Sequence, residues 1–450
     1  MKRYLIPAVC MAAVCLGACS NESKLPVATG KGNIRAINAI PSAPAFSFLI
    51  EERLIGSVDY RASTGTSSYD DLEYTFNFEV LLAGDSTRTR VASQFLDVEA
   101  DKDYTFIIGG TIAAPVITLS EGDVREWSGD ETAFEARFAN TAATLGDVDV
   151  YFAEAMDPPT APVAGAASGT LAFGEFSPAA EFAEGEYILT VTPAGDETTI
   201  LFQSEPFTPA VQTSIILSVF DSVPNDLAPA YVSVFSSGSG GALVDSRFRP
   251  TIRFFHASID AGDVDIYVDD PLGAAIVSDH MFGAVTGDID VPAGDLPLTY
   301  TTAGSMGSIL IDEDRTVFSG TRSNYYLIKS AAGEDAIVTA NLDRRSVETF
   351  ARLSIINTAA NHGSVDVYIV EVDALIDEAL PAIPGLTVGS SPAASPFPSG
   401  SYDIYVTASG AKDVIVGPVR LDVAAGDIIE IVVYDNIDPA IADLVFIPQP

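Results

Sequence analysis

A small set of polar residues recurs four times along the chain and could, by its residue types, carry out chemistry. The fullest copy consists of Arg253, His256, Asp265 and Tyr267. Histidine can act as a general base or bind a metal ion, but the equivalent position holds asparagine in the other three copies, at Asn38, Asn140 and Asn357. Asparagine cannot act as a base, whereas both side chains can hydrogen-bond the backbone at the end of a strand. We therefore predict that this position stabilises a turn.

Three of the copies place an acid and a phenol two residues apart, as Asp149 with Tyr151, Asp265 with Tyr267, and Asp366 with Tyr368. Side chains two residues apart on a strand point to the same face, so these pairs could line a binding groove. The structural alternative, which we favour, is that an arginine of the preceding strand meets the aspartate while the tyrosine packs over both. The arginines concerned are Arg35, Arg137, Arg253 and Arg352.

Other residues suited to catalysis or metal binding are sparse. The sequence has no Gly-x-Ser-x-Gly motif, and His280 and His362 are not spaced with a second histidine or a cysteine as in a zinc site. Aspartates gather at 260, 263, 265, 269 and 270 and at 288, 290 and 295. Aspartate oxygens suit calcium, but neither segment follows the Asp-x-[Asp/Asn]-x-[Asp/Asn]-Gly loop. We predict a solvated acidic rim, and no catalytic residue, metal or cofactor; equal melting temperatures in EDTA and in calcium would exclude the calcium alternative.

The elements expected to position these residues are strands. Val264, Ile266 and Val268 share one strand face, and equivalent residues repeat this pattern in the later and earlier copies. Short apolar runs bounded by glycine and proline, with almost no helical periodicity, are typical of an antiparallel β-sandwich of about seven strands. The repeat of roughly 100 residues is the size of a domain. We expect an all-β chain of four tandem immunoglobulin-like β-sandwich modules, each with its own core.

The predicted organisation is a signal peptide at 1–18, a tether at 19–32, and modules at 33–130, 131–247, 248–348 and 349–450. Within the modules we expect hairpins such as Phe95 to Ile108 and Val419 to Val433. The segment from Ser236 to Gly241 is rich in serine and glycine and is predicted to be a flexible tip or linker.

The N-terminus has the features of an export signal. Lys2 and Arg3 precede an apolar segment, Leu5 to Leu16, that is too short to span a membrane comfortably. The sequence Leu16-Gly17-Ala18-Cys19 resembles the lipobox of bacterial lipoproteins. That resemblance implies cleavage before Cys19, a lipid on its thiol, and anchoring to the outer membrane with the body facing the periplasm or the cell surface.

The charge of the chain argues against nucleic acid as a partner. Aspartate and glutamate number 62 against 23 lysines and arginines, which gives a formal net charge of -39. Binding to a phosphate backbone requires clustered cations. An acidic surface that keeps an exported protein soluble is the simpler interpretation.

The repeated motif resembles the "domain of unknown function 4397" family of exported bacterial β-sandwich modules. The pattern is carried by Arg253-Phe254-Phe255-His256-Ala257-Ser258 with Asp265-Ile266-Tyr267, and by Arg137-Phe138-Ala139-Asn140-Thr141 with Asp149-Val150-Tyr151. The resemblance implies the fold and an exported setting, but no activity.

From these features we expect a non-catalytic lipoprotein of the cell envelope, whose tandem modules bind or adhere to a glycan or a protein at the bacterial surface. One alternative is an envelope enzyme, similar to a carbohydrate hydrolase, with its site between modules. The other alternative is a purely structural spacer.

Overall fold

The computed structural model of the chain describes residues 26–155 and 167–448, except residues 225, 239, 270–271, 331 and 341–343. The predicted signal peptide and Cys19 lie outside the described residues. In the described part, no helix has the length and apolar character required to cross a membrane.

The described strands form eight sheets that pack in pairs, so the prediction of four tandem all-β sandwich modules is confirmed. Module 1 has the sheets β4-β1-β7-β8 and β3-β2-β5-β6, and module 2 has β12-β9-β15-β16-β17 and β11-β10-β13-β14. The strands of module 1 are β1 (Lys31–Asn38), β2 (Phe46–Ile50), β3 (Arg53–Val58), β4 (Ser67–Asp70), β5 (Glu73–Val80), β6 (Thr89–Asp97), β7 (Lys102–Gly110) and β8 (Pro115–Asp123). Those of module 2 are β9 (Ala133–Asn140), β10 (Val148–Glu154), β11 (Gly169–Leu171), β12 (Ala180–Ala183), β13 (Tyr187–Pro193), β14 (Phe202–Gln203), β15 (Ser214–Asp221), β16 (Ala230–Phe235) and β17 (Gly240–Ala242).

Modules 3 and 4 repeat this plan, with the sheets β21-β18-β24-β25 and β20-β19-β22-β23, then β29-β26-β32-β33 and β28-β27-β30-β31. The elements of module 3 are β18 (Thr251–His256), the 3-10 helix η1 (Ile259–Ala261), β19 (Val264–Val268), β20 (Val277–His280), β21 (Ile289–Asp290), β22 (Gly294–Thr302), β23 (Ile309–Val317), β24 (Arg322–Lys329) and β25 (Asp335–Ala340). Those of module 4 are β26 (Ala351–Asn357), the 3-10 helix η2 (Ala360–His362), β27 (Val365–Glu371), β28 (Ile383–Leu386), β29 (Ser395–Phe397), β30 (Gly400–Ala408), β31 (Val414–Val423), β32 (Ile428–Asp435) and β33 (Ala442–Pro448).

The predicted hairpins at Phe95 to Ile108 and Val419 to Val433 are wrong. Strands β6 and β7 belong to different sheets of module 1, and β31 and β32 to different sheets of module 4, so the chain crosses between sheets at these points. The second strand of each crossing then pairs parallel with the first strand of its module, as β7 does with β1 and β32 with β26. Turn residues mark where a strand ends, but they do not determine which sheet receives the next strand.

Each module has its own apolar core, filled by alternate residues of facing strands. In module 3, Ile252 and Phe254 of the first sheet meet Val264 and Ile266 of the second. These four side chains are at most 1% exposed. Burial of such a side chain contributes about 1.5–3 kcal/mol, which makes this alternation the main local determinant of the sandwich.

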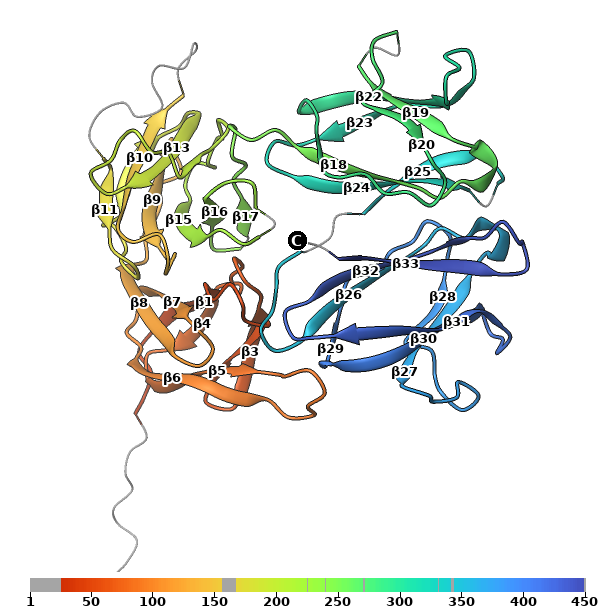
Figure 1. The fold of residues 1–450 in the computed structure, drawn as a ribbon. Coiled ribbons are helices and arrows are strands. Elements are labelled where there is room, and N and C mark those ends of the chain that lie inside the picture. Colours follow the sequence, from red (N-terminus) through yellow and green to blue (C-terminus); the bar gives the residue numbers. More distant parts are fainter. Residues whose placement is uncertain are drawn as a thin grey trace, which may run out of the picture.

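The modules also pack against each other in two pairs. The outer faces of the sheets that contain β1 and β9 share a buried apolar cluster that includes Ile37, Ile107, Ile216 and Phe220. The sheets that contain β18 and β26 share a second cluster in the same way. Figure 1 shows the result, two stacked pairs lying side by side. The modules therefore have separate cores, as expected, but they also share buried interfaces.

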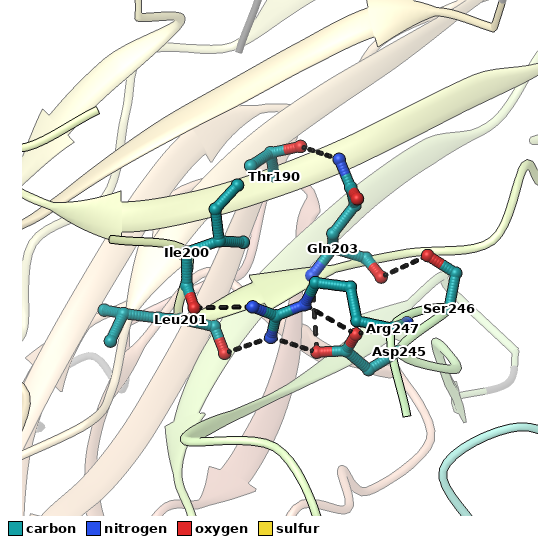
Figure 2. A network of polar contacts seen from close by, with 7 residues as sticks. All are labelled: Thr190, Ile200, Leu201, Gln203, Asp245, Ser246 and Arg247. Atoms are coloured by element: carbon teal, nitrogen blue, oxygen red, sulfur yellow. Dashed lines mark hydrogen bonds and ion pairs between the residues drawn. The ribbon is translucent and has the colours of Figure 1, made fainter. Parts of the chain in front are cut away.

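The connection between the pairs is held in place on both sides, and Figure 2 shows the contacts with module 2. Arg247 donates hydrogen bonds to the Ile200 carbonyl at 2.6 Å and the Leu201 carbonyl at 3.0 Å of module 2, and its Nε and Nη2 bind the Asp245 carboxylate at 2.9 and 2.6 Å. The Gly320 amide of module 3 donates to the Phe248 carbonyl at 2.8 Å. This connection is thus bound to both of the modules that it joins.

The segment from Ser236 to Gly241 is not the linker between modules 2 and 3. Gly240 begins β17, which pairs antiparallel with β16 in module 2. The Ser236 carbonyl accepts a hydrogen bond from Arg35 Nη1 at 3.0 Å, so this turn contacts module 1. Serine and glycine favour turns and linkers alike, and only the pairing of β17 distinguishes the two.

The chain begins and ends at the same end of modules 1, 3 and 4. In module 1, Asn33 near the start of β1 pairs with Asp103 of β7, whose neighbour Lys102 pairs with Asp123 at the end of β8. Module 2 differs because the additional strand β17 runs back along β16 and leads the chain away. This strand directs the chain toward the second pair of modules.

The segment between modules 3 and 4 contacts module 1. Arg345, whose side chain is 7% exposed, pairs with Asp59 at 2.5 Å and donates to the Pro41 carbonyl at 3.1 Å and to the Ala43 carbonyl. Its guanidinium also lies 5.5 Å from the ring centroid of Tyr60. The two module pairs are therefore joined at this contact as well as through the 2–3 linker.

Candidate functional site in the groove between modules 1 and 2

The His or Asn position of the repeated motif binds backbone groups in every module. Asn140 Nδ2 donates to the Gly146 carbonyl at 2.9 Å, and its Oδ1 accepts from the Ala142 amide at 3.1 Å. Asn357 contacts Gly363 and Ala359 in the same way, and Asn38 accepts from Ile40. His256 reproduces the pattern with its ring, in which Nε2 lies 2.6 Å from the Gly262 carbonyl and Nδ1 accepts from Ser258. The four side chains are 0% exposed.

The Asp of the Asp-x-Tyr pairs also binds backbone. Asp265 accepts from the Asp279 amide at 2.9 Å and from the Gly304 amide at 2.8 Å, and Asp366 accepts from Gly385 and Gly410. Asp149 accepts from the Gly195 amide and the Thr170 hydroxyl. Tyr151, Tyr267 and Tyr368 are 2–7% exposed. These pairs therefore hold the ends of neighbouring strands and do not line an open groove.

The expected partnership between the motif arginine and aspartate does not form. Arg253 lies on β18 and Asp265 on β19, which belong to the two facing sheets of module 3. Because Phe254 and Ile266 occupy the core side, Arg253 and Asp265 point outward from opposite faces of the sandwich. Arg253 instead pairs with Asp288 at 3.2 Å. Arg352 of module 4 donates to the Arg345 carbonyl at 3.4 Å.

The outward direction of the motif arginines places Arg35 and Arg137 at the boundary between modules 1 and 2. A groove at this boundary encloses about 270 Å³, and the residues that line it include Asn33, Arg35, Asp103, Arg125, Trp127 and Gln212. We call it the intermodule groove. A hollow of about 40 Å³ adjoins it and is lined by Arg35, Asp103 and Arg137 among others. The volume of the groove is close to the lower end of the range of roughly 300–1,000 Å³ for small-molecule sites.

Trp127, the only tryptophan of the chain, lies in the connection between β8 and β9 and is half-buried. The Arg125 guanidinium carbon is 3.9 Å from the centroid of its ring. Arg125 is itself bound to Glu181 at 2.6 Å and to Glu131 at 3.1 Å, and these contacts raise its pKa. Gln212 donates to the Glu131 carbonyl at 3.0 Å. The aromatic surface is therefore positioned by contacts with module 2.

Arg35 and Arg137, which both line the adjoining hollow, bind neutral oxygens of the neighbouring module or of their own sheet. Arg35 donates to Thr105 Oγ1 at 2.9 Å as well as to the Ser236 carbonyl. Arg137 donates to the Glu121 carbonyl at 3.1 Å and to Ser120 Oγ at 3.3 Å. Each arginine thus reaches from one module to the other. Burial lowers the pKa of the Arg35 guanidinium.

A second polar cluster, which sequence reasoning missed, is sealed between modules 3 and 4. Glu430 is 0% exposed and accepts hydrogen bonds from the Tyr326 hydroxyl and from Asn324 Nδ2 at 2.8 Å. Arg344, 1% exposed, donates to Asn324 Oδ1 at 2.7 Å. Burial raises the pKa of the Glu430 carboxyl. No pattern in the sequence marks Glu430, because its burial arises from the packing of one module on the next.

Within the described residues, no group of three or more histidine, cysteine, aspartate or glutamate side chains is arranged to hold a metal ion. The aspartates considered for calcium include Asp265, whose two carboxylate oxygens accept the backbone amides described above.

Among solved structures, the chain is similar to "The Bacillus anthracis TIE protein", with 10% identity and a TM-score of 0.15 over 87% of this chain and 68% of that chain. A TM-score of this size supports no conclusion about fold or function. No curated protein matches the chain. The family described as Domain of unknown function (DUF4397) matches residues 32–151 and 250–368.

Each of these matched regions covers one module and the first two strands of the next, from β1 into β10 and from β18 into β27. Together they span more than half of the chain. The chain belongs to the DUF4397 family, with copies of its repeat in both pairs of modules.

Proposed function

We propose that the protein is a non-catalytic lipoprotein of the bacterial cell envelope that binds a glycan in the intermodule groove. The observation that carries this proposal is the position of Trp127, which packs on Arg125 at the groove. The groove also presents the side-chain amides of Asn33 and Gln212 and the carboxylate of Asp103. An aromatic face packs on the C–H groups of a sugar ring, and convergent polar groups bind its hydroxyls.

Glycan-array binding of the soluble form, residues 20–450, tests the proposal. We expect Trp127→Ala to weaken binding roughly tenfold, which corresponds to the loss of one aromatic contact, and Trp127→Phe to retain most of it. Phe318→Ala is the matched control, since Phe318 is 62% exposed and lies outside the groove. Equal binding by Trp127→Ala and the wild type would overturn the proposal. Release of reducing sugar from a bound glycan would favour the envelope enzyme.

The proposed anchor is a lipid on Cys19, supported by the lipobox-like sequence that ends at this residue. Cys19→Ala should move the protein from the membrane fraction to the soluble fraction and abolish labelling with radioactive palmitate. Protease treatment of intact cells then tests the surface location. Complete protection from protease in intact cells, with digestion after lysis, would place the body in the periplasm and contradict a surface adhesin.

A further inference from the structure

The two arginines at the boundary of modules 1 and 2 have no carboxylate partner among the described residues. The chain has 62 aspartates and glutamates against 23 lysines and arginines, so we expect most arginines to have an acidic side chain as an ion-pair partner. Arg35 and Arg137 nevertheless bind only hydroxyl and carbonyl oxygens, and Nη2 of each makes no hydrogen bond within the described part of the chain. A guanidinium binds a carboxylate more strongly than it binds a neutral oxygen. Arg35 and Arg137 could therefore each still bind a carboxylate.

The acids nearest to these arginines are already bound elsewhere. Asp103 accepts a hydrogen bond from Asn33 Nδ2 at 2.9 Å. Asp123 pairs with Lys102 at 2.8 Å, and Glu135 lies 3.8 Å from Arg125. Asp103, Asp123 and Glu135 line the same hollow as Arg35 and Arg137, so an anion that enters it must bind through the two guanidinium groups in the presence of these carboxylates.

Module 3 shows this arginine position with an internal acid as its partner. Ile252 of β18 pairs with Ile289 of β21, so Asp288 lies opposite Arg253, with which it forms an ion pair. By the same register, Ile34 pairs with Ser67, so Thr66 lies opposite Arg35. Ala136 pairs with Ala180, and Ala179 therefore lies opposite Arg137. Modules 1 and 2 keep the arginine but replace its internal acid with a neutral residue.

We infer that the intermodule groove takes a carboxylate-bearing sugar, whose carboxylate occupies the hollow between Arg35 and Arg137 while its ring lies toward Trp127. This inference rests on the proposed glycan-binding function and specifies its ligand class. The hollow of about 40 Å³ has room for a small polar group such as a carboxylate, since a water molecule requires roughly 10–15 Å³ of such space. Thr66 and Ala179 place no acid opposite Arg35 and Arg137 on the neighbouring strand.

The test compares a glucuronic acid oligosaccharide with its carboxyl-reduced analogue, by calorimetry on the residue 20–450 form. We expect the acid to bind at least tenfold more tightly, and this preference to decrease with added salt. Thr66→Asp supplies the acid that module 3 has and should abolish the preference. Thr66→Asn, its neutral counterpart of the same shape, should retain it.

A second variant removes the preference without changing charge. A Cβ at Gly122 would lie 2.2 Å from Arg137 Nη2, so Gly122→Ala must displace that guanidinium from the surface of β8. The displaced atoms are the flexible end of a side chain, so we expect a melting temperature close to that of the wild type and a loss of acid preference. Gly129→Ala is the control, since a Cβ there meets no atom within 4 Å.

The outcomes separate this inference from the proposed function. Equal binding of the acid and the reduced sugar, or equal effects of Thr66→Asp and Thr66→Asn, would overturn the carboxylate inference and leave glycan binding intact. If neither sugar binds and Trp127→Ala has no effect on any glycan, both fail. If Thr66→Asp does not fold, Gly122→Ala and Ala179→Asp decide the question alone.

Discussion

Buried polar side chains that bind backbone amides fix the turns of each module, and Asp265 is a clear example. Its two carboxylate oxygens accept the amides of Asp279 and Gly304. Asp265→Asn replaces one of these acceptors with a donor, so we expect a loss of about 1.5–3 kcal/mol in the unfolding free energy of module 3. Chemical denaturation measures it, with Asp290→Asn, an exposed position on β21, as the control. A change below about 0.5 kcal/mol would show that the carboxylate is dispensable.

Buried histidines in module 3 make its stability depend on pH. Burial, together with the nearby His256 ring, lowers the pKa of His280 from 6.5 to about 4. His280 takes up a proton near pH 6.5 in the unfolded chain but only near pH 4 in the folded chain. The stability of the fold is therefore complete above pH 6.5 and decreases as the pH falls from 6.5 to about 4. The loss is at most about 3 kcal/mol, and His280→Leu should remove this part of the pH dependence. NMR titration of the His280 ring in the full chain provides the direct measurement, and a midpoint near 6.5 would contradict the prediction.

At the residue scale, the sequence predicted some contacts and missed others for definable reasons. The hydrogen bonds of Asn140 and His256 to backbone could be anticipated, since two residue types with that shared capacity alternate at one position. The partner of Arg253 could not be predicted. Alternation along a strand shows on which face a side chain lies, but it does not show which other sheet that face meets. The exposure of Arg35 to a groove, and the burial of Glu430, depend on how whole modules pack.

At the scale of elements, alternation and turn residues located most strands but not their order in the sheets. The parallel pairing of β1 with β7 joins residues about 70 positions apart, and no local signal encodes it. The start of β17 lies in the segment predicted to be a flexible tip or linker, since Gly240 and Gly241 carry no apolar pattern. Local propensity therefore predicts that strands exist, whereas long-range pairing determines which strands are neighbours.

The linker between modules 2 and 3 leads to a prediction at this scale. Arg247→Ala removes the hydrogen bonds to Ile200 and Leu201 and the ion pair with Asp245. We expect the linker to become susceptible to proteolysis near residue 247 and the radius of gyration in solution scattering to increase, while the sandwiches stay folded. Arg249→Ala is the matched control, because it removes the same charge from an exposed position of the same linker. Identical scattering and cleavage for both variants would show that Arg247 does not restrain the linker.

At the scale of the whole molecule, Arg345 joins module 1 to the segment between modules 3 and 4. Arg345→Ala leaves the carbonyls of Pro41 and Ala43 and the carboxylate of Asp59 without this partner. We expect a loss of about 1.5–3 kcal/mol from the contact between the module pairs and a more extended particle in scattering. Lys412→Ala is a control of equal charge change within module 4, whose contacts stay inside that module. An unchanged particle size in Arg345→Ala would mean that the 2–3 linker alone holds the pairs together.

The placement of the first and last strands at one end of modules 1, 3 and 4 determines how such a protein can grow. When the chain leaves a module at the end where it entered, the next module must fold back alongside the first. Such a module makes the molecule broader. Duplication of these modules therefore favours a compact block over an extended string. If the N-terminus is fixed to a surface, the distance that the block can travel from that surface depends on the length of the chain before β1. A longer tether would extend this distance more effectively than a fifth module.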